Sequence, residues 1–179
     1  LTAAGFDAGD APPDRAKLDD GERPRVVVVT ANIALQEQLM QKDIPLLQRI
    51  LPQPFTAAIA KGKANYLCLD RFDDSATELL MDPLHDPEDR KRWNAIAEWK
   101  STTETGDFSE LPFEISGALR QRVATTSDDC TGKACARYLE CHAEAARRKW
   151  KEADILVTNY HMLFAHLAFE QGAEERGAG

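Results

Sequence analysis

The chain has 179 residues, of which 43% are hydrophobic and 29% charged, and its formal net charge is −8 at pH 7. This composition indicates a folded protein with one ordinary core and argues against a uniformly basic nucleic-acid coat protein. No run of about 18 apolar residues occurs, so we expect no transmembrane helix and no membrane partner. The first five residues lack the basic start and apolar run of a signal peptide, which favours a cytoplasmic protein. Because the chain does not begin with Met, we expect a piece of a longer protein.

The N-terminal third predicts a loop, a strand and two helices. Residues 1–24 are rich in Asp, Ala, Gly and Pro, which is typical of a loop or a disordered connection. Arg25–Thr30 is a continuous β-branched run and predicts a strand buried on both faces in a parallel sheet. A helical pattern follows over Ile33–Met40. We expect the Asp43-Ile44-Pro45 sequence to break this helix and to start a short one over Leu46–Leu51.

The rest of the chain predicts a second strand, a long helical excursion and a third strand. Phe55–Ala60 predicts the second strand. Arg71–Val123 predicts irregular helices interrupted by Pro and acidic residues, and Pro87–Lys100 has the clearest helical pattern among them. Arg137–Glu152 predicts an amphipathic helix that leads to a short buried strand, Ile155–Thr158. Strands and helices at both ends with a helical segment between them indicate an interrupted α/β domain.

The four cysteines of the chain are its strongest chemical signal: Cys68, Cys130, Cys135 and Cys141. Without an export signal a disulfide framework is improbable, and metal ligands or free thiols are favoured. Structural zinc sites usually use close C-x2–4-C pairs, which this spacing fits loosely at best, whereas a four-iron cubane accepts wider spacing. The spacing favours a metal centre, iron–sulfur ahead of zinc, and four unrelated buried thiols remain the alternative.

Two groups of polar side chains are candidates for contacting a nucleic acid. They are Thr30, Asn32 and Gln36, at and after the end of the first strand, and Lys61, Lys63 and Tyr66 after the second. The first group lies at the carboxyl end of a buried strand, where α/β sheets bind ligands, and can donate hydrogen bonds to phosphates. The second combines phosphate-neutralising charge with an aromatic ring that can stack on a base. The alternatives are a helix cap with solvated glutamines and a basic turn on a solvated surface.

No catalytic residue is expected in this chain. His161 lacks a Ser or Cys nucleophile with a supporting acid nearby. The sequence contains neither a G-x-x-x-x-G-K-[ST] phosphate loop nor an Asp-Glu-Ala-His box that could hold magnesium. We therefore expect that the chain by itself does not hydrolyse ATP.

Four segments, taken in order, resemble the DinG/XPD family of iron–sulfur superfamily 2 DNA helicases, and the bacterial DinG-like branch most closely. They are VVVVTANIALQEQL from Val26, KGKANYLC ending at Cys68, CTGKAC from Cys130 followed by Cys141, and ADILVTNY from Ala153. The resemblance implies an enzyme that couples ATP hydrolysis to 5′→3′ unwinding of DNA. It also implies that this chain is a fragment between the Walker A motif and the DEAH box, and is inactive alone.

The resemblance further implies an α/β fold: part of a RecA-like, P-loop NTPase-type motor domain with an inserted, mainly helical iron–sulfur domain. Residues 25–63 would belong to the motor domain, 64–152 to the insert, and 153–179 to the return into the motor domain and a C-terminal truncation. The four cysteines would hold a [4Fe–4S] cluster whose role we expect to be mainly structural, because residues 69–129 look too acidic and irregular to keep their shape alone.

Partners and cofactors follow from the same resemblance. Single-stranded or forked DNA and the remainder of the motor would be the partners, with ATP and Mg²⁺ bound only by the intact protein. The first polar group would lie along the DNA track and the second would border the pore of the cluster domain. Two alternatives remain open: a zinc-stabilised nucleic-acid-binding module and a small iron–sulfur electron-transfer protein.

Overall fold

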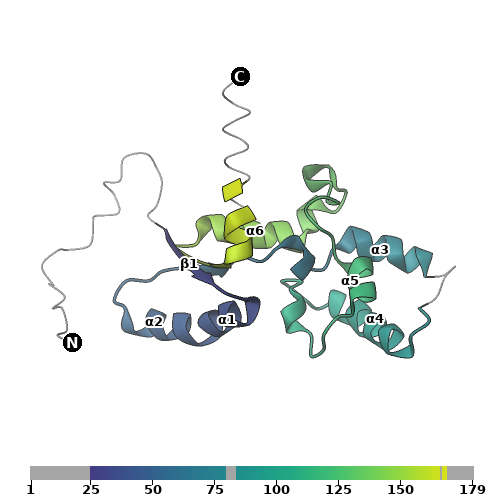
Figure 1. Ribbon diagram of the computed structural model, residues 1–179, viewed down its shortest axis with the longest axis horizontal. Coiled ribbons are helices and arrows are strands. Elements are labelled where there is room, and N and C mark those ends of the chain that lie inside the picture. Colours follow the sequence, from purple (N-terminus) through teal and green to yellow (C-terminus); the bar gives the residue numbers. More distant parts are fainter. Residues whose placement is uncertain (1–24, 80–83, 166, 169–179) are drawn as a thin grey trace, which may run out of the picture.

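The computed structural model describes residues 25–79, 84–165 and 167–168. The loop expected over residues 1–24 and the end of the expected motor segment, 169–179, lie outside the described residues. Two groups of elements lie next to each other along the long axis of the molecule (Figure 1). One contains a small sheet with α1 and α2, and the other contains α3, α4 and α5.

A three-stranded parallel sheet forms from both ends of the described chain. Its strands are β1 (Val26–Thr30), β2 (Ala57–Ile59) and β3 (Ile155–Asn159), in the order β1-β3-β2. Val157 of the central strand is fully buried and pairs with Val28 on one side and Ile59 on the other. The parallel pairing confirms the α/β class. The prediction that β1 is buried on both faces is wrong. It is an edge strand, and Val26 and Val27 at its amino end are 57% and 45% exposed.

The helix after β1 continues where the sequence predicted a break. α1 (Ile33–Gln38), the π-helical turn η2 (Leu39–Asp43) and α2 (Ile44–Ile50) follow one another without a gap. Pro45 lies in the first turn of α2. A proline inside an α-helix clashes with the carbonyl four residues earlier and cannot donate its own bond. The wider π turn before Pro45 accommodates the ring, so the chain bulges instead of breaking.

The segment between β2 and the cysteine-rich stretch has a hydrophobic core of its own. Its elements are η3 (Lys63–Asn65), α3 (Leu69–Glu78), α4 (Pro87–Lys100), η4 (Phe108–Glu110) and α5 (Gly117–Val123). Its buried core residues are Leu67, Phe72, Ile96, Phe108, Leu119, Val123 and Ala124. Trp93 stacks on Phe72 with the ring centroids 4.5 Å apart. Residues 69–129 share more apolar packing than their sequence suggested, because α3, α4, η4 and α5 each contribute one or two buried side chains to one core. The expectation that they struggle to keep their shape alone stays a prediction.

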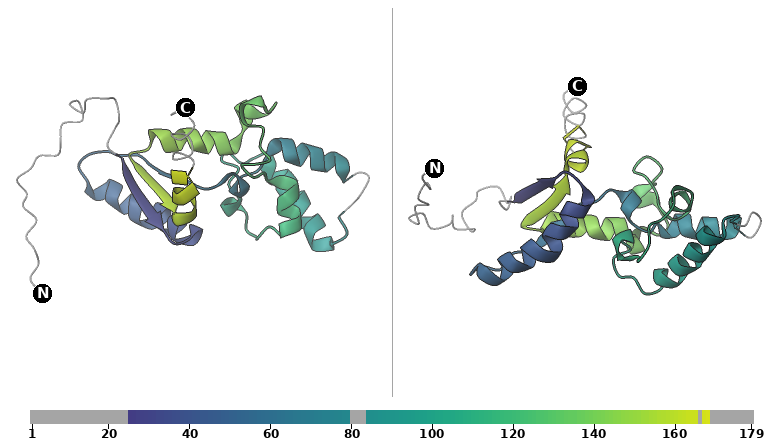
Figure 2. Two further views of the ribbon diagram at one scale, coloured as in Figure 1. Left: turned by 45° about the horizontal axis from the view of Figure 1, so that its top comes forward. Right: turned by 60° about the horizontal axis from the view of Figure 1, so that its bottom comes forward.

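The cysteine-rich stretch contains two single turns and then returns to the sheet. The turns are η5 (Gly132–Ala134) and η6 (Tyr138–Glu140), and α6 (His142–Glu152) follows. The helix predicted from Arg137 begins at His142 instead, because Cys141 has an extended backbone (φ −67°, ψ 115°). Figure 2 shows α6 running from the cysteine-containing turns to the sheet, where it contacts β2. None of the described helices combines the length and hydrophobicity needed to cross a bilayer.

Candidate metal centre

Four free cysteines line a single small hollow. Cys68 comes from the start of α3, and the other three come from the stretch 130–141. All four side chains are partly buried. The fold thus brings thiols from two distant parts of the chain to the wall of the same cavity.

Two of the four cysteines are held at the beginnings of helices. Cys68 is the N-cap of α3, and its backbone N–H donates to the Val123 carbonyl at 2.8 Å. Cys141 is the N-cap of α6. Neither side chain caps its helix by a hydrogen bond. The start of a helix therefore fixes the backbone of both cysteines.

Backbone N–H groups also face the sulfurs. The Gly132 N–H donates to Cys130 Sγ at 3.4 Å, and Gly132 has a φ of 60°, which its missing side chain permits. Hydrogen bonds of this kind to cysteine sulfurs are one of the means by which proteins tune iron–sulfur clusters.

Burial raises the pKa of the Cys68 thiol, and the nearby Asp70, Cys141 and Cys135 raise it further, against a lowering hydrogen bond from the Arg71 backbone. The thiol of the metal-free protein therefore keeps its proton more strongly than an isolated cysteine. A bound cation would reverse this balance, because metal binding releases the protons of its ligands.

The donor set fits an all-cysteine cluster. Such sets are the usual ligands of a [4Fe–4S] centre, in which each thiolate binds a different iron, so the sulfurs need not converge on one ion. Within the described parts of the chain, no group of three or more His, Cys, Asp or Glu side chains is arranged so that it could hold a metal ion.

The polar residues at the carboxyl end of β1 and just after it lie mostly inside the protein. Thr30 is 4% exposed and its hydroxyl donates to the Asn32 carbonyl at 2.9 Å. Asn32 is exposed and caps α1, since its Oδ1 accepts from the Leu35 N–H at 2.9 Å. Gln36 is fully buried, with Nε2 donating to the Ala60 carbonyl at 3.3 Å. Its Oε1 is buried without a hydrogen-bond partner among the residues described. The structure therefore supports the helix cap, but not the solvated glutamine at position 36.

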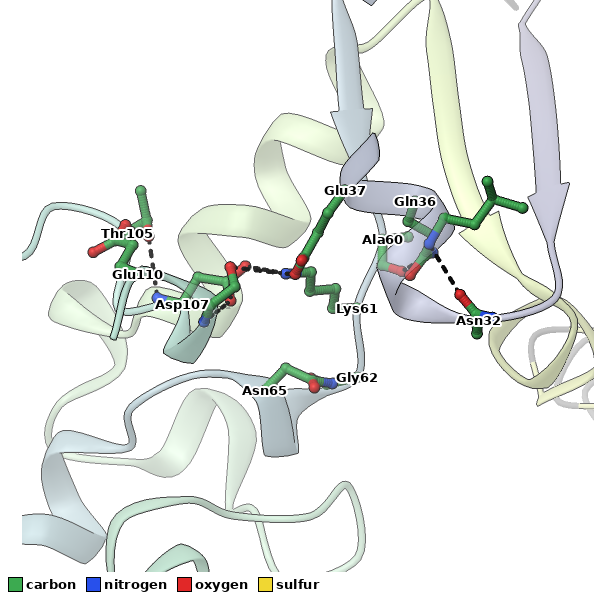
Figure 3. A network of polar contacts seen from close by, with 12 residues as sticks. Asn32, Gln36, Glu37, Ala60, Lys61, Gly62, Asn65, Thr105, Asp107 and Glu110 are labelled. Carbon is green, nitrogen blue, oxygen red and sulfur yellow. Dashed lines mark hydrogen bonds and ion pairs between the residues drawn. The ribbon is translucent and has the colours of Figure 1, made fainter. Parts of the chain in front are cut away.

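Lys61 is buried in a network that joins the two halves of the molecule (Figure 3). Its Nζ donates to Glu37 Oε1 of α1 at 2.9 Å, to Asp107 Oδ2 at 2.7 Å and to Ser109 Oγ of η4 at 3.2 Å. In this arrangement the charge of Lys61 is balanced within the protein and does not face solvent.

Lys63 and Tyr66 lie beside the cysteines, because both line the hollow described above. The side chain of Lys63 is 24% exposed and its Nζ lies 3.9 Å from Glu144 Oε1 of α6. Tyr66 is 4% exposed, and burial together with the charge of Asp107 raises the pKa of its phenol far above the usual value. Of the six residues expected to contact DNA, Asn32 and Lys63 are the two with substantial access to solvent, and their role stays a prediction.

Sequence reasoning missed a charged cluster beside the cysteines. Arg137, between Cys135 and Cys141, pairs with Asp73 of α3, which also binds Lys100 of α4. These contacts join residues far apart in the sequence, and no local pattern announces them. The sequence signal for this cluster was the position of a positively charged residue, Arg137, between Cys135 and Cys141.

Comparison with known proteins gives this arrangement a context. No family model matches the chain. The chain is 31% identical over 148 residues, 82% of its length, to the ATP-dependent DNA helicase YoaA of Haemophilus influenzae. It is 35% identical over 164 residues to the ATP-dependent helicase DinG of Mycobacterium tuberculosis, and 31% over 160 residues to DinG of Escherichia coli, with 83% of the chain covered in each case.

The matched region spans 22–24% of the length of these relatives. All three relatives are ATP-dependent helicases by name. The chain belongs to the DinG-like family of helicases.

Proposed function

We propose that the protein carrying this sequence is an ATP-dependent DNA helicase that unwinds DNA in the 5′→3′ direction, and that this chain supplies its [4Fe–4S] domain. The observation that carries the proposal is the meeting of four distant cysteines at one hollow, in a chain similar to DinG and YoaA helicases over more than four fifths of its length. Neither observation alone would indicate a cluster. Free buried thiols are common, and the names of the similar helicases mention no iron or sulfur.

In this proposal the chain divides into two units. Residues 25–63 and those from 153 onward belong to the RecA-like motor domain, and 64–152 form the inserted cluster domain. Two features support this division. β1 and β3 pair directly although the whole segment 64–152 lies between them in sequence, and that segment has its own hydrophobic core.

Cys68, Cys130, Cys135 and Cys141 would hold the cluster, and the cluster would supply metal–thiolate bonds that close a long loop of the chain. Closing such a loop removes entropy from the unfolded state, so metal binding adds to the folding free energy. Because the helical core forms from other residues, the part of the insert that depends on this closure is the loop that carries three of the ligands, residues 126–141.

We further propose that Asn32 and Lys63 contribute to the path of single-stranded DNA. Asn32 is exposed just beyond the carboxyl end of β1, the edge at which α/β sheets bind ligands. Lys63 carries a partly exposed charge and lines the cysteine hollow. ATP and Mg²⁺ would bind to other parts of the longer protein. The chain alone would have no ATPase activity, since its sequence contains no phosphate loop.

Metal and sulfide analysis of anaerobically purified protein tests the cluster. We expect about four iron and four acid-labile sulfide per chain. Zinc without sulfide would contradict the cluster and support the zinc-module alternative. The helicase proposal is tested separately with the full-length protein on duplexes that carry either a 5′ or a 3′ single-stranded tail, and unwinding of the 3′-tailed substrate alone would contradict the proposed direction.

A further inference from the structure

Asp73 connects the cysteine-containing loop to the helical core. One carboxylate oxygen accepts from Arg137 Nη2, and the other accepts from Lys100 Nζ at 2.6 Å. Asp73 lies on α3, the helix that begins beside Cys68, and Arg137 lies between Cys135 and Cys141 and lines the cysteine hollow. This contact therefore joins the first cysteine's helix to the loop that carries the other three.

The Asp73 side chain is itself fixed by the core. Lys100 Nζ lies 4.6 Å from the centroid of the Phe72 ring, next to Asp73 in the chain. Phe72 is buried and stacks on Trp93 of α4. The ammonium group is thus held between a core ring and the carboxylate. An ion pair whose partners belong to such a network contributes more than an isolated surface pair.

No described residue of the 130–141 loop belongs to the hydrophobic core, although Tyr138 is partly buried and lines the cysteine hollow. Leu139 is 87% exposed, so its side chain does not anchor the loop. Arg137 is braced within the loop by Glu140, whose Oε2 accepts from Nη1 at 3.1 Å. Its guanidinium therefore bridges one carboxylate of the loop and one of α3.

We propose that Asp73 and Arg137 are positioning residues for the metal centre: they hold the 130–141 loop against the start of α3, so that Cys135 and Cys141 stay within reach of Cys68. This inference rests on the proposed cluster. Residues that hold the ligands of a metal, without binding it, typically change metal retention by 10–100-fold when they are replaced. The hydrogen bond from Lys100, and then the one from Arg137, lower the pKa of Asp73 below its ordinary value, as expected for a carboxylate held between two cations.

The test compares cluster loss in Asp73→Asn and Arg137→Gln with the wild type. Protein with its cluster is mixed with an iron chelator, and the decay of iron–sulfur absorbance is followed. We expect about tenfold faster loss in each variant, and in the double variant a rate no faster than in the singles, because both act through one contact. Asp73→Glu, which retains the carboxylate, should restore most of the retention.

Glu78→Gln is the matched control, because Glu78 lies on the same helix and pairs with Arg122 of α5 at 3.5 Å, away from the cysteine loop. It should leave the rate of cluster loss unchanged. Hydrogen exchange at the Phe72 and Leu119 amides shows whether each variant keeps its core, and Arg137→Gln replaces a loop residue that contributes no apolar side chain to this core.

The outcomes separate the two proposals. If the wild type holds iron and sulfide and both variants lose them at the wild-type rate, the positioning role is wrong and the cluster assignment stands. If variant and control accelerate loss equally, the effect is general destabilisation and the positioning role is also wrong. If the wild type holds no iron and sulfide, the proposed cluster fails first, and the inference fails with it.

Discussion

Lys61 Nζ and Asp107 Oδ2 lie 2.7 Å apart in the interior, where Lys61 is only 3% exposed. The lysine follows β2 and the aspartate begins η4, so this ion pair spans the junction between the sheet and the helical segment (Figure 3). Glu37 supplies a second carboxylate at 2.9 Å. A buried lysine with two acidic partners is stable only while all three remain together.

Replacing Lys61 by Met should destabilise the protein by about 3 kcal/mol, because breaking a buried ion pair leaves carboxylates without a counter-charge. Urea denaturation measures the loss. Lys63→Met is the control, since Lys63 is partly exposed and 3.9 Å from its acidic neighbour, and it should cost less than about 1 kcal/mol. Equal effects of the two substitutions would show that the buried network contributes no special stability.

Stability should fall at alkaline pH because of Tyr66. Burial raises the pKa of its phenol, so the folded protein retains this proton where an unfolded tyrosine, with a pKa of about 10, loses it. The folded state then binds more protons than the unfolded state, and the free energy of unfolding decreases as pH rises above about 10, by at most about 1.4 kcal/mol per pH unit. Urea unfolding of the wild type and of Tyr66→Phe between neutral and alkaline pH isolates this contribution. Parallel curves for the two proteins would contradict it.

Gly106 should not tolerate a side chain. Its φ is 63°, and a Cβ at this position would lie 2.3 Å from Cγ of His142. Gly106→Ala therefore combines backbone strain with a clash against the first residue of α6, and should cost about 2–4 kcal/mol. Gly132→Ala separates the two terms, because Gly132 has a φ of 60° but nothing within 4 Å of the added atom, and should cost only about 1 kcal/mol. Thermal unfolding of both variants tests the difference.

Loss of a ligand of the proposed cluster should loosen the 126–141 loop and leave the hydrophobic core intact. In Cys135→Ser, or after removal of iron by a chelator, we expect faster hydrogen exchange at the amides of residues 126–141. The amides of core residues such as Ile96 and Leu119, both fully buried, should keep their protection because their packing involves no cysteine. Faster exchange throughout 69–129 would instead show that the proposed cluster stabilises the whole of residues 64–152.

Local sequence signals predicted β1, β3 and α4 well, whereas β2 is shorter than the expected Phe55–Ala60. The β-branched residues of β1 and β3 gave their positions to within one residue, and α4 has the expected bounds because Asp86 caps it and Pro87 opens its first turn. The four cysteines were also apparent, since thiols are scarce in the chain and their types alone suggest a shared site.

Contacts between distant residues were not predictable in the same way. The buried position of Gln36 depends on the Ala60 carbonyl, and the pairing of Asp73 with Arg137 depends on how α3 meets the cysteine loop. Single-sequence patterns record how a residue relates to its neighbours along the chain, so a buried lysine such as Lys61 looks like an exposed one. For this reason polar residues expected at a DNA-facing edge proved to be partly internal.

The central strand of the sheet, β3, is the third described strand in the sequence. The sheet therefore cannot form until this late part of the chain is present. β1 and β2 do not pair with each other, and Val26 finds its partner only at Ile155. During synthesis the core around Phe72 and Leu119 is complete in sequence well before β3 emerges. We therefore expect the helical segment to fold first. Once folded, it should lower the entropic cost of bringing β1 and β3 together.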